Sequence, residues 1–277
     1  MKNIAGIALM CVCLCGCGLS NKKKAEAFVN KAKSEIAHED YKSARSNCSL
    51  AIELNRNLAI AYYNRAIAKY NLQDDKGAIL DFEEFIKLRS NDSIGYTYLY
   101  LGMAKLHLKD YSGAISDFTN AIKVEPKDAL NYTLRGKAKS EINDSLGAIS
   151  DCNKAIEVDS GCAEAYNNRG LYKYFNGSYK EALLDLNKAI QIDSSLVAAY
   201  NNRAVVNRKL KNYYATIKDY DRAIVLSPDN GDVYENRGCA KYRMGDKNGA
   251  CADLRKAVSL GDSSAVEQLK EVLAVGR

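Results

Sequence analysis

Apolar residues recur at helical spacing along most of the chain, and short runs of turn-forming residues interrupt them at regular intervals. In the stretch 163–196, two helical patterns flank Asn176, Gly177 and Ser178, a run that favours a turn. Ser178 and Glu181 have capping-box spacing, at which the serine hydroxyl can accept an amide proton while the glutamate reaches back. The stretch therefore predicts a helix hairpin whose second helix begins at Ser178.

This hairpin pattern recurs seven times in register. Successive copies begin 34 residues apart, except for one interval of 36. In every copy the fourth place is aromatic, the eighth is Gly or Ala, and the twentieth is Ala or Thr. Small residues on both helices allow close packing, which explains the two columns of small residues. The copies cover residues 25–58, 59–92, 95–128, 129–162, 163–196, 197–230 and 231–264.

The ends of the copies fit the same scheme. The only prolines, Pro126 and Pro228, stand where second helices should end, because proline lacks an amide hydrogen and fixes φ. After the last copy, residues 265–277 carry an apolar helical face that predicts a capping helix. This face comprises Val266, Leu269, Val272 and Leu273.

The period, with Tyr166, Gly170, Ala182 and Leu186 in their places, resembles the tetratricopeptide repeat, although Ser194 replaces the expected proline. The resemblance implies an all-α fold, a right-handed superhelical solenoid of seven tetratricopeptide helix hairpins plus a C-terminal capping helix. It also implies that the concave face binds segments of other proteins.

Two columns of charge depart from the family pattern. The seventh place, where the family carries leucine, is arginine in five copies, and the twenty-third place is aspartate in six. Repeated opposite charges at one phase predict ion pairs within or between hairpins, and a cationic stripe for an acidic ligand is the alternative. The arginines are Arg65, Arg135, Arg169, Arg203 and Arg237.

By resemblance to the family, the first helix of each hairpin lines the groove, and its sixth place carries an interrupted row of asparagines. A carboxamide both donates and accepts hydrogen bonds, so such a row could hold the main chain of an extended peptide. The alternative is that these asparagines serve contacts between hairpins. The row comprises Asn30, Asn64, Asn168, Asn202 and Asn236, and Asn167 and Asn201 adjoin it.

The other groove places differ along the chain. The middle copies carry large apolar and aromatic side chains, which suit the burial of ligand side chains. The last copies carry cations that could receive an acidic side chain or a terminal carboxylate. The first set includes Tyr63, Tyr70, Tyr100 and Met103, and the second comprises Arg208, Lys209 and Arg243.

The N-terminus has the features of a secretory signal: Lys2, an apolar segment over residues 4–14, and then small residues. The apolar segment is too short for a permanent membrane span. The sequence Leu14-Cys15-Gly16-Cys17 resembles the bacterial lipobox, which implies cleavage before Cys17 and a lipid on that cysteine. An ordinary cleaved signal with incidental cysteines is the alternative.

The lipobox resemblance divides this region into a signal peptide, residues 1–16, and a lipidated cysteine with a polar tether, residues 17–24. The residue directly after the cysteine is Gly18, and in this respect the sequence resembles lipoproteins that are sorted to an outer membrane. The resemblance therefore implies a bacterial cell envelope protein, lipid-anchored at the periplasmic face of the outer membrane.

Composition narrows the classes of function. The chain has 277 residues, of which 47% are hydrophobic and 27% charged, as in folded proteins, and its net charge of +6 is spread out, which disfavours nucleic acid binding. His38 and His107 lack partners at metal-ligand spacing, and no phosphate loop or nucleophile motif occurs. We therefore expect no metal, cofactor, small-molecule substrate or enzymatic activity. Cys239 and Cys251, on the two helices of one hairpin, could come close enough to oxidise.

Together these features predict a membrane-anchored envelope lipoprotein that acts as a protein–protein interaction adaptor. It would bind a peptide or helix of other envelope proteins in its groove, in the assembly of an envelope complex. The alternative is a structural or self-associating scaffold with no peptide ligand.

Overall fold

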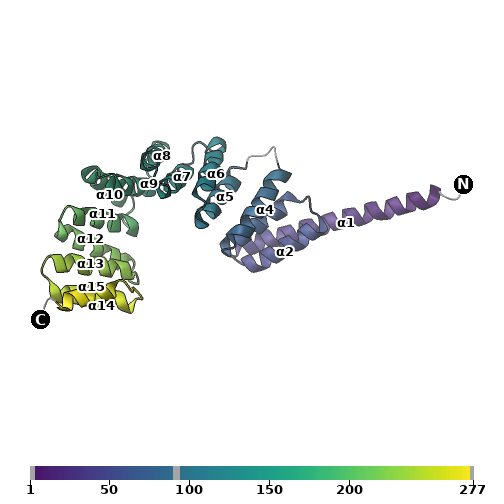
Figure 1. Cartoon of the computed structure of the whole chain (residues 1–277). Coiled ribbons are helices and arrows are strands. Elements are labelled where there is room, and N and C mark those ends of the chain that lie inside the picture. The colour runs from purple at the N-terminus through teal and green to yellow at the C-terminus, as the bar shows by residue number, and fades with distance from the viewer. Residues whose placement is uncertain (1–3, 90–93, 275–277) are drawn as a thin grey trace. The chain divides into compact units, whose positions relative to one another are not determined.

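The computed structural model describes residues 4–89 and 94–274, and its side chains from residue 20 onward. All regular elements in these ranges are helices (Figure 1), and they form two compact units, residues 1–127 and 128–277. The first unit contains α1 (Ile4–Ala37), α2 (Tyr41–Leu54), α3 (Ala59–Asn71), α4 (Asp75–Leu88), α5 (Gly95–His107) and α6 (Tyr111–Val124).

The second unit contains the remaining helices and ends with the described part of the predicted cap, α15. In chain order they are α7 (Ala129–Glu141), α8 (Ser145–Val158), α9 (Ala163–Phe175), α10 (Tyr179–Ile192), α11 (Val197–Lys209), α12 (Tyr213–Leu226), α13 (Gly231–Arg243), α14 (Lys247–Ser259) and α15 (Ala265–Ala274).

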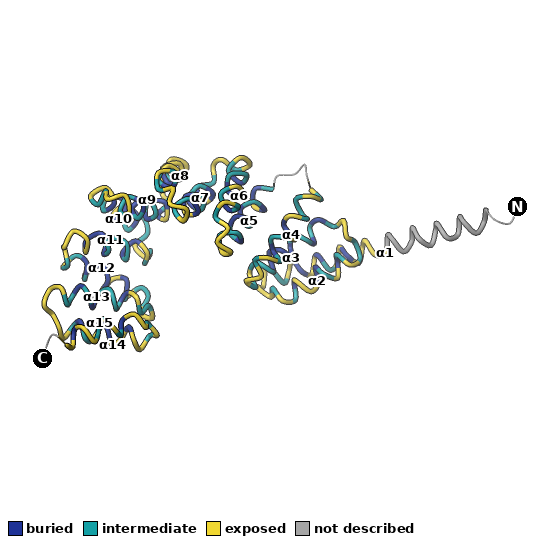
Figure 2. Tube along the Cα trace, viewed as in Figure 1, coloured by how far each residue is buried: buried dark blue, intermediate teal, exposed yellow. Residues whose placement is uncertain are grey.

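Within each unit the helices pack in hairpins, α1 with α2 and so on to α13 with α14. The second helix of one hairpin packs against the first helix of the next, as α2 does on α3 and α10 on α11, and α14 packs against α15. Figure 2 shows the consequence, in which buried residues follow the facing sides of the helices. The predicted all-α solenoid of helix hairpins is confirmed.

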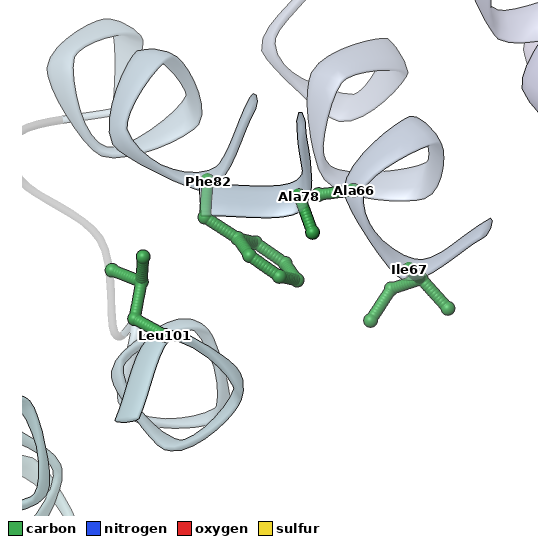
Figure 3. Packing of buried hydrophobic residues seen from close by; sticks show 5 residues of the cluster. All are labelled: Ala66, Ile67, Ala78, Phe82 and Leu101. Carbon is green, nitrogen blue, oxygen red and sulfur yellow. The ribbon is translucent and has the colours of Figure 1, made fainter. Parts of the chain in front are cut away.

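The facing small residues let the helices of a hairpin approach each other. Ala66 of α3 and Ala78 of α4 are both fully buried, and Phe82 packs beside them (Figure 3). Leu101 of α5 contacts the same cluster, so one core joins two successive hairpins of the first unit. Large and small side chains therefore alternate across the interface, as a close-packed interior requires.

The turn within each hairpin ends in an aspartate cap more often than in a serine cap. Asp40, Asp110 and Asp144 each accept a hydrogen bond from the amide three residues later, at 3.1, 3.0 and 2.9 Å. Ser178 is the residue before α10, as predicted, but its side chain makes no capping hydrogen bond. The expected capping box is therefore wrong at that hydrogen bond, although the helix starts where it predicts.

One residue in each of these turns adopts the left-handed conformation, which favours glycine. Lys109 has φ of 61° and Gly177, at the same repeat place, has φ of 80°. Because a side chain in this region costs about 1–2 kcal/mol, Lys109→Gly should stabilise the first unit by up to about 1 kcal/mol after the added chain entropy. Gly177→Ala should destabilise the second unit by a similar amount.

Urea unfolding followed by circular dichroism measures both changes in the turns. Shifts of the same sign in the two variants would contradict the assignment of strain to this backbone position.

The first helix extends further toward the N-terminus than the sequence predicts. Helix α1 begins at Ile4, so residues 17–24, which we expected as a polar tether, continue the helix of the first hairpin. Their side chains from Ser20 to Lys24 are exposed, and burial begins at Ala25. The side chain of Cys17 lies outside the described part. Among the described residues, no helix has the length and hydropathy needed to cross a membrane.

Candidate functional site

The predicted arginine–aspartate pairs are present. In α9 and α10, the Arg169 guanidinium donates from Nε and Nη2 to the two oxygens of Asp185, at 2.9 and 2.6 Å. Lys173 adds a contact of 2.7 Å to the same carboxylate, and the guanidinium lies over the ring of Tyr166 at 5.4 Å. Asp185 is 5% exposed, so both cations hold a buried anion.

Four of these arginines, Arg65, Arg169, Arg203 and Arg237, also reach the preceding hairpin. Arg169 Nη1 donates to Asn153 of α8 at 2.7 Å, and Arg203 Nη1 donates to Asn187 of α10 at 2.7 Å. One guanidinium therefore connects three helices of two successive hairpins. The guanidinium groups of these arginines bond to other side chains of the repeats. This favours the ion-pair interpretation over a cationic stripe for a ligand.

The third hairpin departs from this pattern because Leu101 occupies the arginine place. Among the described residues, its aspartate, Asp117, has only Lys105 as a cationic partner. The Lys105 Nζ lies 2.7 Å from Oδ2 in an ion pair without hydrogen-bond geometry. Burial raises the pKa of Asp117 above its ordinary value, and Lys105 opposes this shift. Leu101 instead packs into the apolar core of the first unit.

The asparagine row does not form a uniform ladder. Asn64 is 5% exposed with an unpaired buried Nδ2, while Asn30 is exposed and Asn236 donates to the Asp232 carbonyl in its own helix at 2.8 Å. The row therefore does not present one uniform surface, and ligand binding by its less buried members stays a prediction. Side chains at one repeat place diverge because their neighbours differ from hairpin to hairpin.

Three asparagines of the second unit instead bond to each other. Asn202 of α11 donates to Asn167 of α9 at 2.8 Å, and Asn167 donates to Asn168 at 3.1 Å. Asn167 is buried, so it serves the contact between hairpins. Asn168, Asn201 and Asn202 are half-buried, and Oδ1 of Asn201 has no hydrogen-bond partner in the described part.

The predicted aromatic floor of the first unit is largely used in internal packing. Tyr63 lies edge-on to Phe82 with ring centroids 5.9 Å apart, and Tyr100 contacts both Phe82 and Tyr70, at 5.8 and 5.5 Å. Met103, three residues after Tyr100, is half-buried. These residues retain only part of their surface for a ligand.

His107 joins the same aromatic group from the end of α5. Its ring stacks on Tyr70 at 5.4 Å, and its Nδ1 lies 3.2 Å from Oδ1 of Asp75, the first residue of α4. The sequence predicts no acidic partner for this histidine. The partner comes from the preceding hairpin, 32 residues away, so local spacing could not reveal it.

The second unit contains a cavity of about 740 Å³ that brings the predicted basic residues together. Arg208 and Lys209 end α11, Arg243 ends α13, and the last helix, α15, also contributes to the lining. This volume lies within the usual range of ligand sites, about 300–1,000 Å³. The full lining comprises Tyr174, Val205, Arg208, Lys209, Lys211, Tyr213, Cys239, Tyr242, Arg243, Leu254, Gln268, Glu271 and Val272. We call this the C-terminal pocket.

The charge of the C-terminal pocket is one-sided. Its lining has four cations and one carboxylate, Glu271, which leaves a formal excess of three positive charges. Arg208 and Arg243 are exposed and make no ion pair or hydrogen bond with another described residue. Among the described arginines of the second unit, they contrast with Arg169, Arg203 and Arg237, whose donors are all directed at packing partners.

Two buried polar atoms near this pocket lack a partner in the described part. They are Oε1 of Gln268, which lines the pocket from α15, and the hydroxyl of Tyr220 on α12. Burial raises the pKa of Tyr220 to about 12, and the nearby Arg208 charge lowers it by less. Buried polar atoms usually have partners, so these two are exceptions, and of the two residues only Gln268 lines the pocket.

The cysteines of the described hairpins are free thiols. Cys239 and Cys251, the pair that we expected could oxidise, are both half-buried and unbridged. Cys48 and Cys152 are fully buried core residues, and burial raises the pKa of each thiol to about 12. A thiol held protonated in this way is unreactive.

Comparison with known proteins identifies the repeats. Models of the tetratricopeptide repeat match residues 163–196, 197–230 and 231–260. RNA polymerase II-associated protein 3 of Xenopus tropicalis is 40% identical to this chain over 62 residues. That match covers 22% of this chain and 9% of the relative, so the chain spans only a small part of that protein.

Solved structures extend the likeness along the chain. A tetratricopeptide repeat protein from Parabacteroides merdae ATCC 43184 has a TM-score of 0.74 and 17% identity, over 91% of this chain and 99% of that one. YrrB, described as a tetratricopeptide repeat protein with an unusual peptide-binding site, has a TM-score of 0.51 and 22% identity, over 66% of this chain and 93% of that one.

The fold is therefore that of the helical-hairpin solenoids that serve as scaffolds for protein interaction. Residues 163–260 are tetratricopeptide repeats.

Proposed function

We propose that this protein is a membrane-anchored adaptor of the bacterial cell envelope. A lipid on Cys17 attaches it to a membrane, and peptide segments of other envelope proteins bind in the C-terminal pocket. The pocket is the observation that supports binding most directly, because it combines suitable volume with cations that packing does not use. The lipobox-like sequence around Cys17 supports the anchor.

The repeats supply a rigid frame for such a site. We call an arginine that bonds to its aspartate and to the preceding hairpin an arginine clasp. The clasps of Arg203 and Arg237 join successive hairpins, so packing rather than loops holds α11 and α13. A site on rigid helices keeps its charged groups in place before the ligand arrives, which lowers the entropic cost of binding. The anchor raises the local concentration of the adaptor near membrane-bound partners.

The anchor can be tested in bacterial cells that express the full chain. Cys17→Ser should lose incorporation of labelled fatty acid completely, because a serine hydroxyl does not replace the thiol as the lipidated group. Cys15→Ser is the matched control and should keep the label. Labelling that persists in Cys17→Ser but disappears in Cys15→Ser would move the lipid to another cysteine, and labelling in both would exclude Cys17 as the anchor.

Light scattering separates the adaptor from the self-associating scaffold. The fragment 25–277, which lacks the apolar N-terminal segment, should keep the mass of a monomer as its concentration rises, since an adaptor needs a partner rather than a second copy. A mass that grows with concentration would favour the scaffold.

A further inference from the structure

We propose that the C-terminal pocket recognises an acidic peptide segment, whose carboxylate lies between Arg208 and Arg243 and whose main chain donates a hydrogen bond to Gln268. The inference rests on the proposed binding function and specifies its ligand. It makes α15 part of the binding site, in addition to its role as a cap over α14.

The described arginines of the second unit include some that bond to packing partners and some that do not. Arg169, Arg203 and Arg237 each donate two hydrogen bonds to an aspartate and one to the preceding hairpin, as Arg237 does to Asp253 and Asp221. Arg208 and Arg243 stand five and six residues after that place, at the ends of their helices. Cations there interact favourably with the helix dipole, but this interaction leaves their donors free.

Arginine in this situation favours a carboxylate. The guanidinium is planar and presents paired N–H groups that match the two oxygens of a carboxylate. Two guanidinium groups on one pocket can therefore hold an acidic side chain or a chain terminus. The tyrosines at positions 174, 213 and 242 line the same pocket and give apolar surface for the rest of the ligand.

Gln268 selects for a ligand that also donates hydrogen bonds. Its Oε1 is buried and unpaired in the described part, although the residue lines the pocket. A buried acceptor without a partner costs about 1–3 kcal/mol, which a donor from the ligand would recover. A peptide presents main-chain N–H donors next to its side chains, whereas a simple anion presents none.

The α15 helix carries this acceptor because of its position in the repeat register. Ala265 begins 34 residues after Gly231, so α15 takes the place of the first helix of an eighth hairpin. No second helix follows within the described residues, and Val272 fills the place that is Gly or Ala elsewhere. Glu271 stands where the hairpins carry arginine, and its carboxylate enters the pocket lining.

Removing the charge of Glu271 should strengthen binding, whereas removing the charges of the pocket arginines should weaken it. Its negative charge opposes an acidic ligand, so Glu271→Gln should tighten binding of acidic peptides by a few-fold, as expected for a charge in a partly solvated site. A residue that only stabilised the fold would not raise affinity when removed.

The test uses the full-length protein in detergent and two random peptide libraries, one with free peptide C-termini and one with blocked C-termini. Peptides selected from either library should be enriched in Asp and Glu. Enrichment in both libraries assigns recognition to acidic side chains, and enrichment of acids only at free termini assigns it to the terminal carboxylate. Selection of peptides without acidic groups would overturn the inference but leave peptide binding intact, whereas selection of no peptide would overturn the binding function itself.

Variants then locate the selected peptides. Arg208→Gln with Arg243→Gln should weaken their binding by roughly 10- to 100-fold, the loss expected for hydrogen bonds to charged groups. Arg222→Gln with Arg255→Gln removes the same charge from exposed residues outside the pocket lining and should leave affinity within about two-fold. Gln268→Leu should weaken binding while the unfolding midpoint is kept or raised. Equal losses in the two double variants would overturn the proposal.

Discussion

Asp185→Asn is expected to lower the free energy of unfolding of the second unit by about 2–4 kcal/mol. The change leaves Arg169 and Lys173 half-buried without their anion, and breaking a buried ion pair by removing one partner is costly. We place the loss below the largest known values because the two cations remain partly solvated. Urea unfolding of the full chain, followed by circular dichroism, measures it as a lower midpoint.

Asp117→Asn in the first unit is the matched control. In the described part of the chain this aspartate has Lys105 and no arginine as its partner, so its removal should change the free energy of unfolding by less than about 1 kcal/mol. Equal losses for Asp185→Asn and Asp117→Asn would contradict the view that the arginine clasp holds successive hairpins together.

The contribution of Asp117 to the free energy of unfolding should depend on pH. Because burial raises its pKa in the folded state, folding favours the protonated form. Its contribution to stability is therefore fully present below the unfolded pKa and is lost as the pH rises through the folded pKa. The stability of Asp117→Asn relative to the wild type should accordingly be highest near neutral pH, and this difference should disappear in acid.

Gly170→Ala is expected to destabilise the second unit by about 1–3 kcal/mol, the usual cost of overpacking a core. A Cβ at this position would lie 2.8 Å from Cγ of Leu186 and 3.2 Å from the carbonyl oxygen of Ala182. Leu186 is fully buried and cannot move aside without disturbing the hairpin. Thermal unfolding monitored by circular dichroism measures the loss.

Gly136→Ala is the matched control at the same repeat place. There the nearest side-chain atom to an added Cβ is Cβ of Asp151, at 3.4 Å, because the buried partner is the smaller Cys152. The better helix propensity of alanine should offset the remaining tight contact with Ala148, so stability should change by less than about 1 kcal/mol. A loss as large as that of Gly170→Ala would show that helix approach alone, and not the size of the facing side chain, requires glycine.

The sequence predicts most of the fold because packing repeats. Gly170 and Leu186 belong to columns that recur in every copy, so their burial could be inferred without a structure. The pairing of Arg169 with Asp185 could be inferred in the same way. The aspartate caps were missed although they also form a column, since Asp, Asn or Ser stands at the place of Asp144 in every copy.

The site is less predictable because it lies outside these columns. Asn64 and Asn202 share one repeat place, yet one is buried and unpaired while the other bonds to a neighbouring helix. Their fates depend on the side chains of adjacent hairpins, which differ. Gln268 could not be recognised at all, because its role follows from where α15 packs rather than from a recurring pattern.

The affinity of a selected acidic peptide for the full-length protein and for the variant with Arg208→Gln and Arg243→Gln tests the central claim most directly. The claim is that cations in the repeated columns hold the fold, while the cations outside them bind the ligand. Isothermal titration should show a loss of roughly 10-fold or more, with an unchanged unfolding midpoint in the same variant. Unchanged affinity, or a loss of affinity that follows a loss of stability, would contradict it.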